Sequence, residues 1–247
     1  MSGNLYELGE LYERFLPPDL EEFNFYTQIA TKVGGPVLEV GCGTGRLVTH
    51  LLNYGIDAYG MDISPKMLEV ARRQRDARDR FILDDMASFE PKRQFNVVIA
   101  GHNAILHLVD SVKLSNFLVR ARRSLLSETS LFVVDVFIPD REFFVYADSS
   151  FHDLEPIRDQ SGRCFSLSEC LVYDKTKQHV ERNFRVTDQN GNVTTFAMTL
   201  RLLFPNELST LLTGHGFQII DRFGTYRNDR LSGSHDRQIC LCTRVAP

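Results

Sequence analysis

Hydrophobic residues over the first 138 positions alternate between helical spacing and short continuous runs. A helix is predicted after Pro17-Pro18-Asp19, because apolar residues recur there every three or four positions until Gly34-Gly35-Pro36. Amphipathic helices are also predicted around residues 47–52, from Ser64-Pro65 onward, and around residues 114–125. Short buried strands are predicted between the helices, at residues 37–40, 56–61, 80–83, 95–100 and 131–137. This alternation indicates a doubly wound α/β domain, in which helices cover both faces of a parallel sheet.

The pattern changes after Pro139, where three consecutive strands are predicted at residues 164–173, 179–187 and 193–201. The last two are joined by Gln189-Asn190-Gly191-Asn192, and Asn-Gly is the strongest short signal for a β-hairpin. A helix from Pro205 and two strands at residues 217–223 and 238–244 follow. We therefore expect an α/β domain of residues 1–138 and 206–247, interrupted by an antiparallel β insertion of residues 139–205.

Composition and charge narrow the possible partners. The 247 residues are 43% hydrophobic and 24% charged, which is ordinary for a globular protein. The formal net charge of -4 gives no reason to expect binding to nucleic acid or to acidic membranes. No apolar run is long enough to cross a bilayer, and the N-terminus has no pattern typical of a signal peptide. The five cysteines lack metal-ligand spacing, so we expect reduced thiols in a cytoplasmic protein without a metal site.

The segment Glu39-Val40-Gly41-Cys42-Gly43-Thr44-Gly45 lies between a predicted strand and a predicted helix. Glycines at such a turn let the backbone pass close to a ligand at a helix N-terminus. The dinucleotide fingerprint requires a third glycine at the position of Arg46, and its absence argues against a nicotinamide-dependent oxidoreductase. A carboxylate at Glu39 would repel a pyrophosphate but can accept hydrogen bonds from a cationic ligand through water.

Two further acidic positions follow the next strands. Asp62 lies at the predicted tip of the second strand, where a carboxylate suits the two hydroxyls of a ribose. It could instead cap the helix that begins near Ser64. Asp84-Asp85-Met86 follows the third strand; one carboxylate there could accept the exocyclic amine of adenine while Met86 covers the ring. We favour Asp85 over Asp84, because Asp85 directly precedes Met86.

These three elements, in this order, resemble the class I S-adenosylmethionine-dependent methyltransferases. The resemblance covers nearly the whole chain, and Gly214-His215-Gly216-Phe217 is similar to the turn before that family's closing strands. It implies a Rossmann-like, mostly parallel seven-stranded sheet with S-adenosylmethionine as cofactor and S-adenosylhomocysteine as product. The insertion and residues 224–230 look most like small-molecule members, including amino-sugar N-methyltransferases. One departure is Ser127-Glu128-Thr129, which lacks the Pro-Gly-Gly turn usual before the fifth strand.

The resemblance also implies a set of cofactor-binding residues. Tyr12 resembles the aromatic residue on the N-terminal lid of small-molecule members. With it we predict contacts to the cofactor from the residues of the motifs above: Tyr12, Glu39, Gly41, Cys42, Gly43, Gly45, Asp62, Ile63, Asp85, Met86 and His102.

Residues for acceptor chemistry are expected where strands of an α/β sheet end. His102 and Asn103 follow the fourth strand directly, and His107 lies one loop further on. We predict His102, His107 and Tyr226 as catalytic residues, with His102 in ligand contact or proton transfer. Methyl transfer depends mainly on orientation and desolvation, and a base is needed only for an acceptor that arrives protonated. Asp135, near the end of the fifth strand, is either part of this site or a buried structural acid.

The predicted function is methyl transfer to a nitrogen or oxygen of a small-molecule acceptor, by a monomer or homodimer. A protein or tRNA methyltransferase and a non-catalytic regulator that binds S-adenosylmethionine are the alternatives. The apolar face of the inserted sheet must cover something. We expect the sheet, together with the N-terminal segment through Phe15, to roof the acceptor pocket; a dimer interface is the alternative.

Overall fold

The computed structural model describes residues 2–3, 19–74, 78–159 and 161–245. The chain divides into two compact units, each of which is treated by itself. One contains Pro139–Leu202 and the N-terminal strand β1 (Ser2–Gly3), and the other contains Pro18–Ile138 and Leu203–Pro247. In the described part of the chain, no helix combines the length and the apolar composition needed to cross a membrane.

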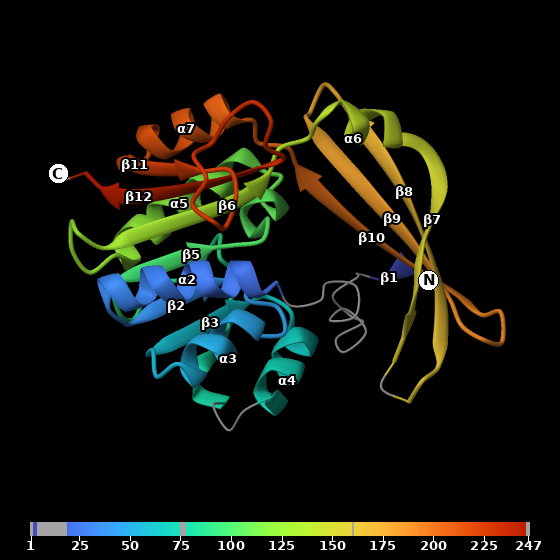
Figure 1. Cartoon of the computed structure of the whole chain (residues 1–247), viewed down its shortest axis with the longest axis horizontal. Coiled ribbons are helices and arrows are strands. Elements are labelled where there is room, and N and C mark those ends of the chain that lie inside the picture. Colours follow the sequence, from blue (N-terminus) through green and yellow to red (C-terminus); the bar gives the residue numbers. More distant parts are fainter. Residues whose placement is uncertain (1, 4–18, 75–77, 160, 246–247) are drawn as a thin grey trace. The chain divides into compact units, whose positions relative to one another are not determined.

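The larger unit is built on a seven-stranded sheet in the order β11-β12-β6-β5-β2-β3-β4 (Figure 1). The parallel strands are β2 (Val37–Val40), β3 (Ala58–Asp62), β4 (Phe81–Leu83), β5 (Val97–Ala100) and β6 (Leu131–Phe137). β12 (Arg237–Arg244) is antiparallel to β6 and to β11 (Phe217–Phe223). The chain order reverses between β2 and β5, and doubly wound folds bind their ligands in the crevice at such a reversal. The predicted fold class is confirmed.

Helices cover both faces of this sheet. Successive side chains of β6 point to opposite faces, and on each face they contact helices. Val133 packs in one cluster with Tyr26 of α2 (Leu20–Val33) and Leu51 of α3 (Arg46–Asn53). The next residue back, Phe132, contacts Phe117 of α5 (Ser111–Ser124), with ring centroids 6.0 Å apart. The remaining helical elements are α4 (Pro65–Gln74), α7 (Pro205–Gly214) and the 3-10 turns η2 (Arg78–Arg80) and η3 (Ala104–His107).

The strand boundaries differ slightly from those predicted. The second strand begins at Ala58 rather than residue 56 and ends at Asp62, which therefore belongs to the strand. The third begins at Phe81, because Arg80 belongs to η2. The fourth begins at Val97, since Phe95 forms only an isolated bridge with Leu125. These shifts leave all the predicted turns at the carboxyl ends of the strands.

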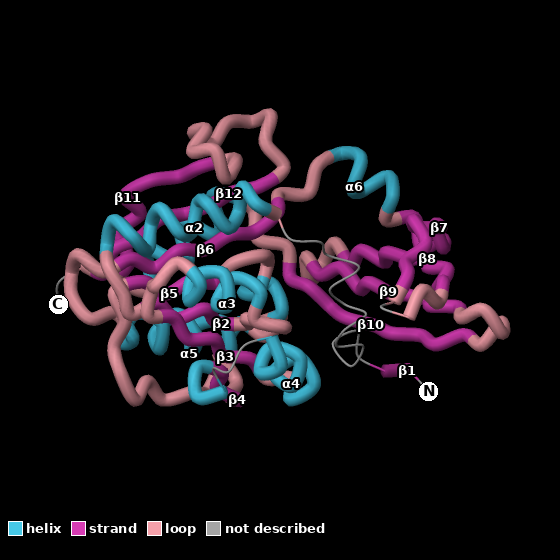
Figure 2. The backbone as a smooth tube through the Cα atoms, turned by 60° about the horizontal axis from the view of Figure 1, so that its bottom comes forward, coloured by secondary structure: helices cyan, strands magenta, loops and turns pink. Residues whose placement is uncertain are grey.

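The smaller unit is a five-stranded sheet in the order β1-β10-β9-β8-β7 (Figure 2). The three predicted strands are confirmed as β8 (Cys164–Asp174), β9 (His179–Thr187) and β10 (Val193–Arg201). The sequence analysis missed α6 (Arg141–Tyr146) and β7 (Asp148–Arg158). β7 is largely exposed and shifts register twice against β8, so that its hydrophobic alternation is weak.

One face of this sheet is apolar, as predicted, and it contains a charged pair. Phe184, Val186 and Phe196 are buried in one cluster, whereas Arg185 is exposed on the opposite face. Glu169 is only 4% exposed and accepts a 2.6 Å ion-pair contact from Arg182. The charge of Arg182 therefore compensates a carboxylate that the apolar surroundings would otherwise destabilise.

Candidate cofactor and acceptor site

The turn between β2 and α3, residues 41–45, is held close to β3 and to η3. The N–H groups of Gly41 and Cys42 both donate to the carbonyl of Met61, at 2.7 and 3.0 Å. A Cβ atom on Gly41 would lie only 2.8 Å from the Cβ of Ala104. At Gly43, φ is +54° and an added Cβ would meet nothing within 4 Å. At Gly43 the turn therefore presents bare backbone to open space, as the close approach of a ligand requires.

The carboxylate of Asp62 is tied to the same turn. Its Oδ2 accepts from the N–H of Gly43 at 2.7 Å, and its Oδ1 accepts from the N–H of Ser64 at 2.8 Å. Burial raises the pKa of Asp62, while these backbone hydrogen bonds lower it. The N–H of Ile63 also donates to this carboxylate, which has about four acceptor positions, so about one remains for a ligand hydroxyl. The capping contact does not exclude the predicted ribose contact, and the bond to Gly43 is one that the sequence did not indicate.

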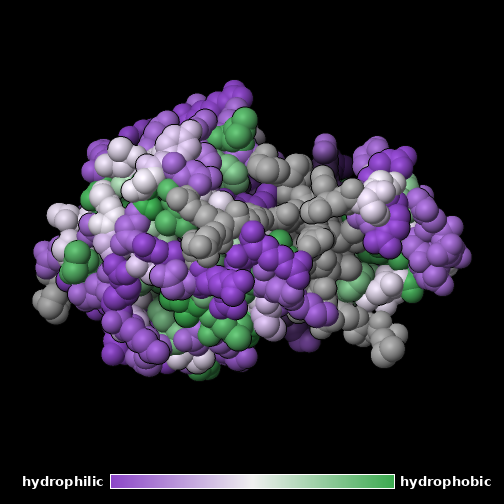
Figure 3. Space-filling model, turned by 90° about the horizontal axis from the view of Figure 1, so that it is seen from below, coloured by the Kyte–Doolittle hydropathy of each residue, from purple (hydrophilic) through white to green (hydrophobic). Residues whose placement is uncertain are grey.

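The segment predicted to hold adenine lies beside the glycine-rich turn. The Cε of Met86 is 3.9 Å from the position that a Cβ on Gly41 would occupy. Ile63 follows the tip of β3 and is 64% exposed. Hydrophobic residues form small separate patches among hydrophilic ones on the face drawn in Figure 3. Asp84 and Asp85 each accept one local backbone N–H, so the preference for Asp85 stays a prediction.

Glu39 is a buried acid with one carboxylate oxygen left without a partner. Its Oε2 is buried without a hydrogen-bond partner, although the N–H of Val48 donates to the carboxylate. Burial raises the pKa of Glu39 well above its usual range, the negative charge of Glu22 raises it further, and Arg46 lowers it. An unpartnered carboxylate beside a bare-backbone turn fits a cofactor with a cationic end and disfavours a pyrophosphate.

We expect Glu39→Gln to stabilise the cofactor-free protein at neutral and higher pH. The pKa of Glu39 is higher in the folded than in the unfolded chain, so its stabilising contribution is complete below the unfolded pKa of about 4.3. It is lost as the pH rises through the folded pKa. The variant should gain about 1–3 kcal/mol in free energy of unfolding at pH 8 and nothing at pH 4. Urea titrations at several pH values measure this, and an equal change at every pH would contradict it.

The loop after β5 adopts a strained conformation that hydrogen bonds from β6 maintain. His102 and Asn103 have φ values of 50° and 68°, a region that few residues other than glycine adopt. Asp135 accepts the N–H of His102 at 3.2 Å through Oδ2, and its carbonyl accepts the N–H of Asn103 at 3.0 Å. Asn103 in turn accepts the N–H of Phe137 at 2.7 Å. The loop is thereby fixed at the carboxyl ends of β5 and β6.

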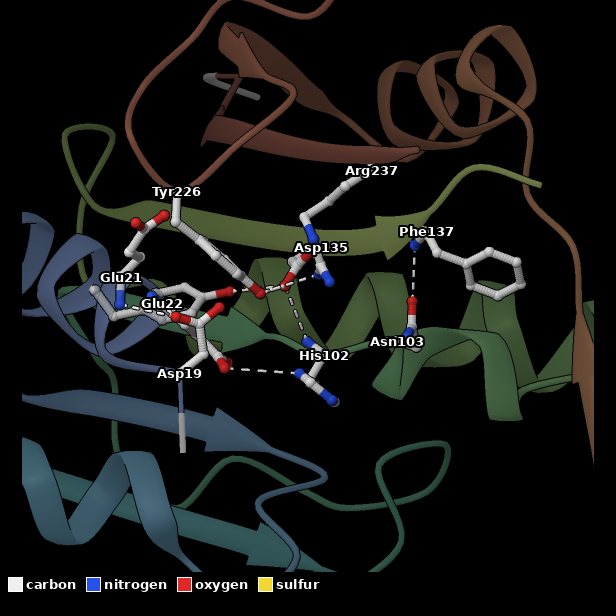
Figure 4. A network of polar contacts seen from close by, with 10 residues as sticks. Asp19, Glu21, Glu22, His102, Asn103, Asp135, Phe137, Tyr226 and Arg237 are labelled. Carbon is white, nitrogen blue, oxygen red and sulfur yellow. Dashed lines mark hydrogen bonds and ion pairs between the residues drawn. The ribbon is translucent and has the colours of Figure 1, made fainter. Parts of the chain in front are cut away.

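This arrangement gives the imidazole of His102 a defined direction (Figure 4). Figure 4 shows the carboxylate of Glu22 directed at the ring, with Nδ1 and Oε2 3.6 Å apart. The ring is about one-third exposed, whereas Glu22 is buried. Strained backbone held by several hydrogen bonds is frequent where a protein positions a side chain for function.

Asp135 is the centre of a buried polar network. Its side chain is fully buried and accepts from Arg237 at 2.7 Å, from Tyr226 at 2.5 Å and from Tyr26 at 3.5 Å. Arg237 also donates to the hydroxyl of Tyr226 at 3.0 Å. The network joins α2, β6, β12 and the segment before β12 (Figure 4). Asp135 is therefore both a satisfied buried acid and the anchor of the His102 loop.

The structure distinguishes among the predicted acceptor-side residues. Tyr226 has its hydroxyl engaged by Asp135 and Arg237, and burial together with the charge of Asp135 raises its pKa. This favours a positioning role for Tyr226 over proton transfer. His107 is half-buried at the end of η3, and Tyr12 lies outside the described residues.

Other predicted contacts are limited by packing. The thiol of Cys42 is buried against Gly60. A cofactor contact from Cys42 would therefore come from its main chain rather than its side chain. Two residues near the site were missed by the sequence analysis, Glu22 and Arg237. Within the described residues, no group of His, Cys, Asp or Glu is arranged to hold a metal ion.

Comparisons with known proteins agree with this geometry. Residues 37–128 match the methyltransferase domain family. An uncharacterised methyltransferase of Geobacillus sp. (strain WCH70) is 27% identical over 69% of this chain and 79% of its own length. A glycine/sarcosine N-methyltransferase of Parasynechococcus marenigrum is 26% identical over 84% of this chain and 72% of its own length. A methyltransferase of Bacillus subtilis is 35% identical, but the match covers only 34% of this chain and 40% of that protein.

Two solved structures share the fold. The CcbJ methyltransferase from Streptomyces caelestis has a TM-score of 0.78 at 19% identity, covering 98% of this chain and 99% of its own. A sugar N-methyltransferase from Streptoalloteichus sp. has a TM-score of 0.76 at 18% identity, covering 100% and 95%. The glycine-rich turn, the acid at the tip of β3 and the unpartnered Glu39 occupy the crevice in which this fold binds its cofactor. Residues 37–128 match the methyltransferase domain, the chain shares its fold with S-adenosylmethionine-dependent methyltransferases, and its site residues fit S-adenosylmethionine as the cofactor.

Proposed function

We propose that this protein transfers a methyl group to a nitrogen or oxygen of a small-molecule acceptor. The observation that carries the proposal is the partly exposed imidazole of His102, held by Asp135 and Glu22 at the carboxyl end of β5. S-adenosylmethionine supplies the methyl group on a sulfonium sulfur, which makes the transfer an in-line displacement. Glu39, the turn of residues 41–45, Asp62 and Met86 would hold the cofactor.

His102 is proposed as the residue that takes a proton from an acceptor that arrives protonated. Glu22 faces Nδ1, which leaves Nε2 as the ring nitrogen directed away from that carboxylate. Histidine is the side chain best suited to proton transfer near neutral pH. Asp135 acts on His102 through the main chain, and Tyr226 and Arg237 hold Asp135, so these three are positioning residues.

The inserted sheet is proposed to cover the acceptor and to select it. The insertion leaves the chain directly after β6, at the carboxyl end where the Asn103 contact to Phe137 also lies. The buried Glu169–Arg182 pair lies on its apolar face, so hydrophobic and hydrogen-bonding groups share one face of the sheet. Such a face suits a mixed polar and apolar molecule, such as a sugar, and would exclude water from the reaction.

The named relatives support a small acceptor. They include a glycine/sarcosine N-methyltransferase and, among the structures, a sugar N-methyltransferase. The net charge of -4 disfavours the alternative of a tRNA methyltransferase. We further propose that the protein acts in the cytoplasm, because its five cysteines are free thiols in the structure.

The experiment is an acceptor screen read by S-adenosylhomocysteine formation. The panel contains free and nucleotide-linked amino sugars, glycine and sarcosine, bulk tRNA and a protein mixture. Turnover with a member of the first two groups is expected, and nuclear magnetic resonance of the product identifies the methylated atom. Turnover with tRNA or protein alone would overturn the proposal.

With the acceptor in hand, His102→Asn should lower kcat about 100- to 10,000-fold, the range for loss of a general base. Asparagine tolerates the positive φ of this position, so the loop should keep its conformation. The affinity for S-adenosylhomocysteine, measured by calorimetry, should change little. An unchanged kcat would mean that the enzyme works by orientation alone and that His102 transfers no proton.

A further inference from the structure

Glu22 is a buried carboxylate that belongs to none of the motifs of this fold. It lies in the first turn of α2 and is 5% exposed, whereas its neighbour Glu21 is exposed and pairs with Arg227. Within the described residues, the ion pair recorded for Glu22 is the 3.6 Å contact to Nδ1 of His102. That nitrogen has no hydrogen-bond partner of its own. A buried carboxylate without a permanent cation is costly unless a ligand or a proton neutralises it.

The charge of Glu22 acts on Glu39, the other buried acid of the site. After burial, the negative charge of Glu22 is the largest contribution that raises the pKa of Glu39. Oε2 of Glu39 is buried and unpartnered. Glu22 comes from α2 and Glu39 from β2, so two elements converge with like charges beside the glycine-rich turn. This placement is electrostatically unfavourable in the empty protein and becomes favourable when a cation lies between or beside the two groups.

We propose that Glu22 is a cofactor-binding residue that, together with Glu39, receives the ammonium group of the methionine part of S-adenosylmethionine. The inference rests on the cofactor assignment and is independent of the acceptor. Other charged or titratable groups that act on Glu22 or Glu39 include Arg46 at the start of α3, Asp62 on β3 and His102 after β5. Two hydroxyls near Glu22, those of Tyr26 and Tyr226, are occupied by Asp135.

One consequence is that cofactor binding releases a proton. In the empty protein we expect Glu39 to hold a proton, because burial and the negative charge of Glu22 raise its pKa. An ammonium group replaces that proton as the compensating charge, and the proton passes to the buffer. A ligand that lacks the ammonium group should bind without releasing a proton.

The test is calorimetry with two probes in two buffers of different ionisation enthalpy, from pH 6 to pH 8. S-adenosylhomocysteine carries the amino acid part, and 5′-methylthioadenosine has the same adenosine thioether without it. In the wild-type protein, the first should release up to one proton and the second none. Glu39→Gln should abolish the release. Release of equal numbers of protons with both probes, or of none with either at any pH, would overturn the proposal.

Glu22→Gln provides the second arm. It should weaken S-adenosylhomocysteine binding about 10- to 100-fold, the usual loss for a charge-assisted hydrogen bond, and leave 5′-methylthioadenosine affinity unchanged. Glu21→Gln on the same helix turn is the matched control and should behave as wild type in both. If Glu22→Gln binds S-adenosylhomocysteine normally, or weakens both probes equally, the inference is wrong. If the wild-type protein binds neither probe, the cofactor assignment itself has failed.

Discussion

Asp135→Ala is expected to lower the free energy of unfolding by about 3–5 kcal/mol, the cost of removing one partner from a buried ion pair. The guanidinium of Arg237 would lose its 2.7 Å contact and stay partly buried as an unpaired charge. The hydroxyls of Tyr26 and Tyr226 would lose their shared acceptor at the same time. Among the described residues, Asp135 is the carboxylate that pairs with Arg237, and Glu22 acts on the two tyrosine hydroxyls only through its charge.

Urea titration of the cofactor-free protein measures this change. Glu21→Gln is the control, because it removes the exposed ion pair with Arg227, and exposed pairs contribute little to stability. Asp135→Asn should fall between the two, since the amide oxygen still accepts a hydrogen bond while the negative charge is lost. An Asp135→Ala protein as stable as Glu21→Gln would show that the network does not hold this part of the fold together.

The sheet and its turns were predictable because each depends on local sequence. Buried parallel strands read as continuous apolar runs, such as residues 97–100, and apolar residues of the helices between them recur every three or four positions. Glycine-rich turns and helix caps are likewise local, and Asp19 caps α2 through the N–H groups of Glu21 and Glu22 as that pattern suggests. The strand β7 was missed because an exposed, bulged strand containing Pro156 lacks a regular alternation.

The partners within the site were less predictable, because they join residues distant in the sequence. Asp135 was recognised as an acid near a strand end, but its contacts to Tyr26, Tyr226 and Arg237 come from three other elements. Glu22 gave a signal that was overlooked. It lies four residues before Tyr26 and seven before Ile29, on the apolar stripe of α2. A glutamate at such a position is paired either with another residue of the core or with a bound ligand, and the sequence alone does not distinguish the two.

Asp62→Ala is expected to weaken S-adenosylhomocysteine binding by about 1.5–3 kcal/mol, or about 10- to 150-fold, through loss of charge-assisted hydrogen bonds to the ribose. The structure adds a cost, because the N–H groups of Gly43 and Ser64 lose their acceptor. Each of these hydrogen bonds contributes about 0.5–1.5 kcal/mol to stability, and the charge of the carboxylate increases that contribution. A modest fall in melting temperature should therefore accompany the loss of affinity.

A change in the ligand distinguishes a direct contact of Asp62 with the ribose from its support of the glycine-rich turn. An S-adenosylhomocysteine analogue without the ribose 2′-hydroxyl should bind the wild-type protein more weakly than S-adenosylhomocysteine does. If Asp62 binds the ribose directly, Asp62→Ala should bind the two ligands almost equally, because the partner of that hydroxyl is already gone. If the carboxylate acts only by holding Gly43 in the turn, the variant should weaken both ligands by the same factor. Calorimetry on the four combinations decides between a direct contact and support of the turn, and the one acceptor position that remains on this carboxylate allows the direct contact.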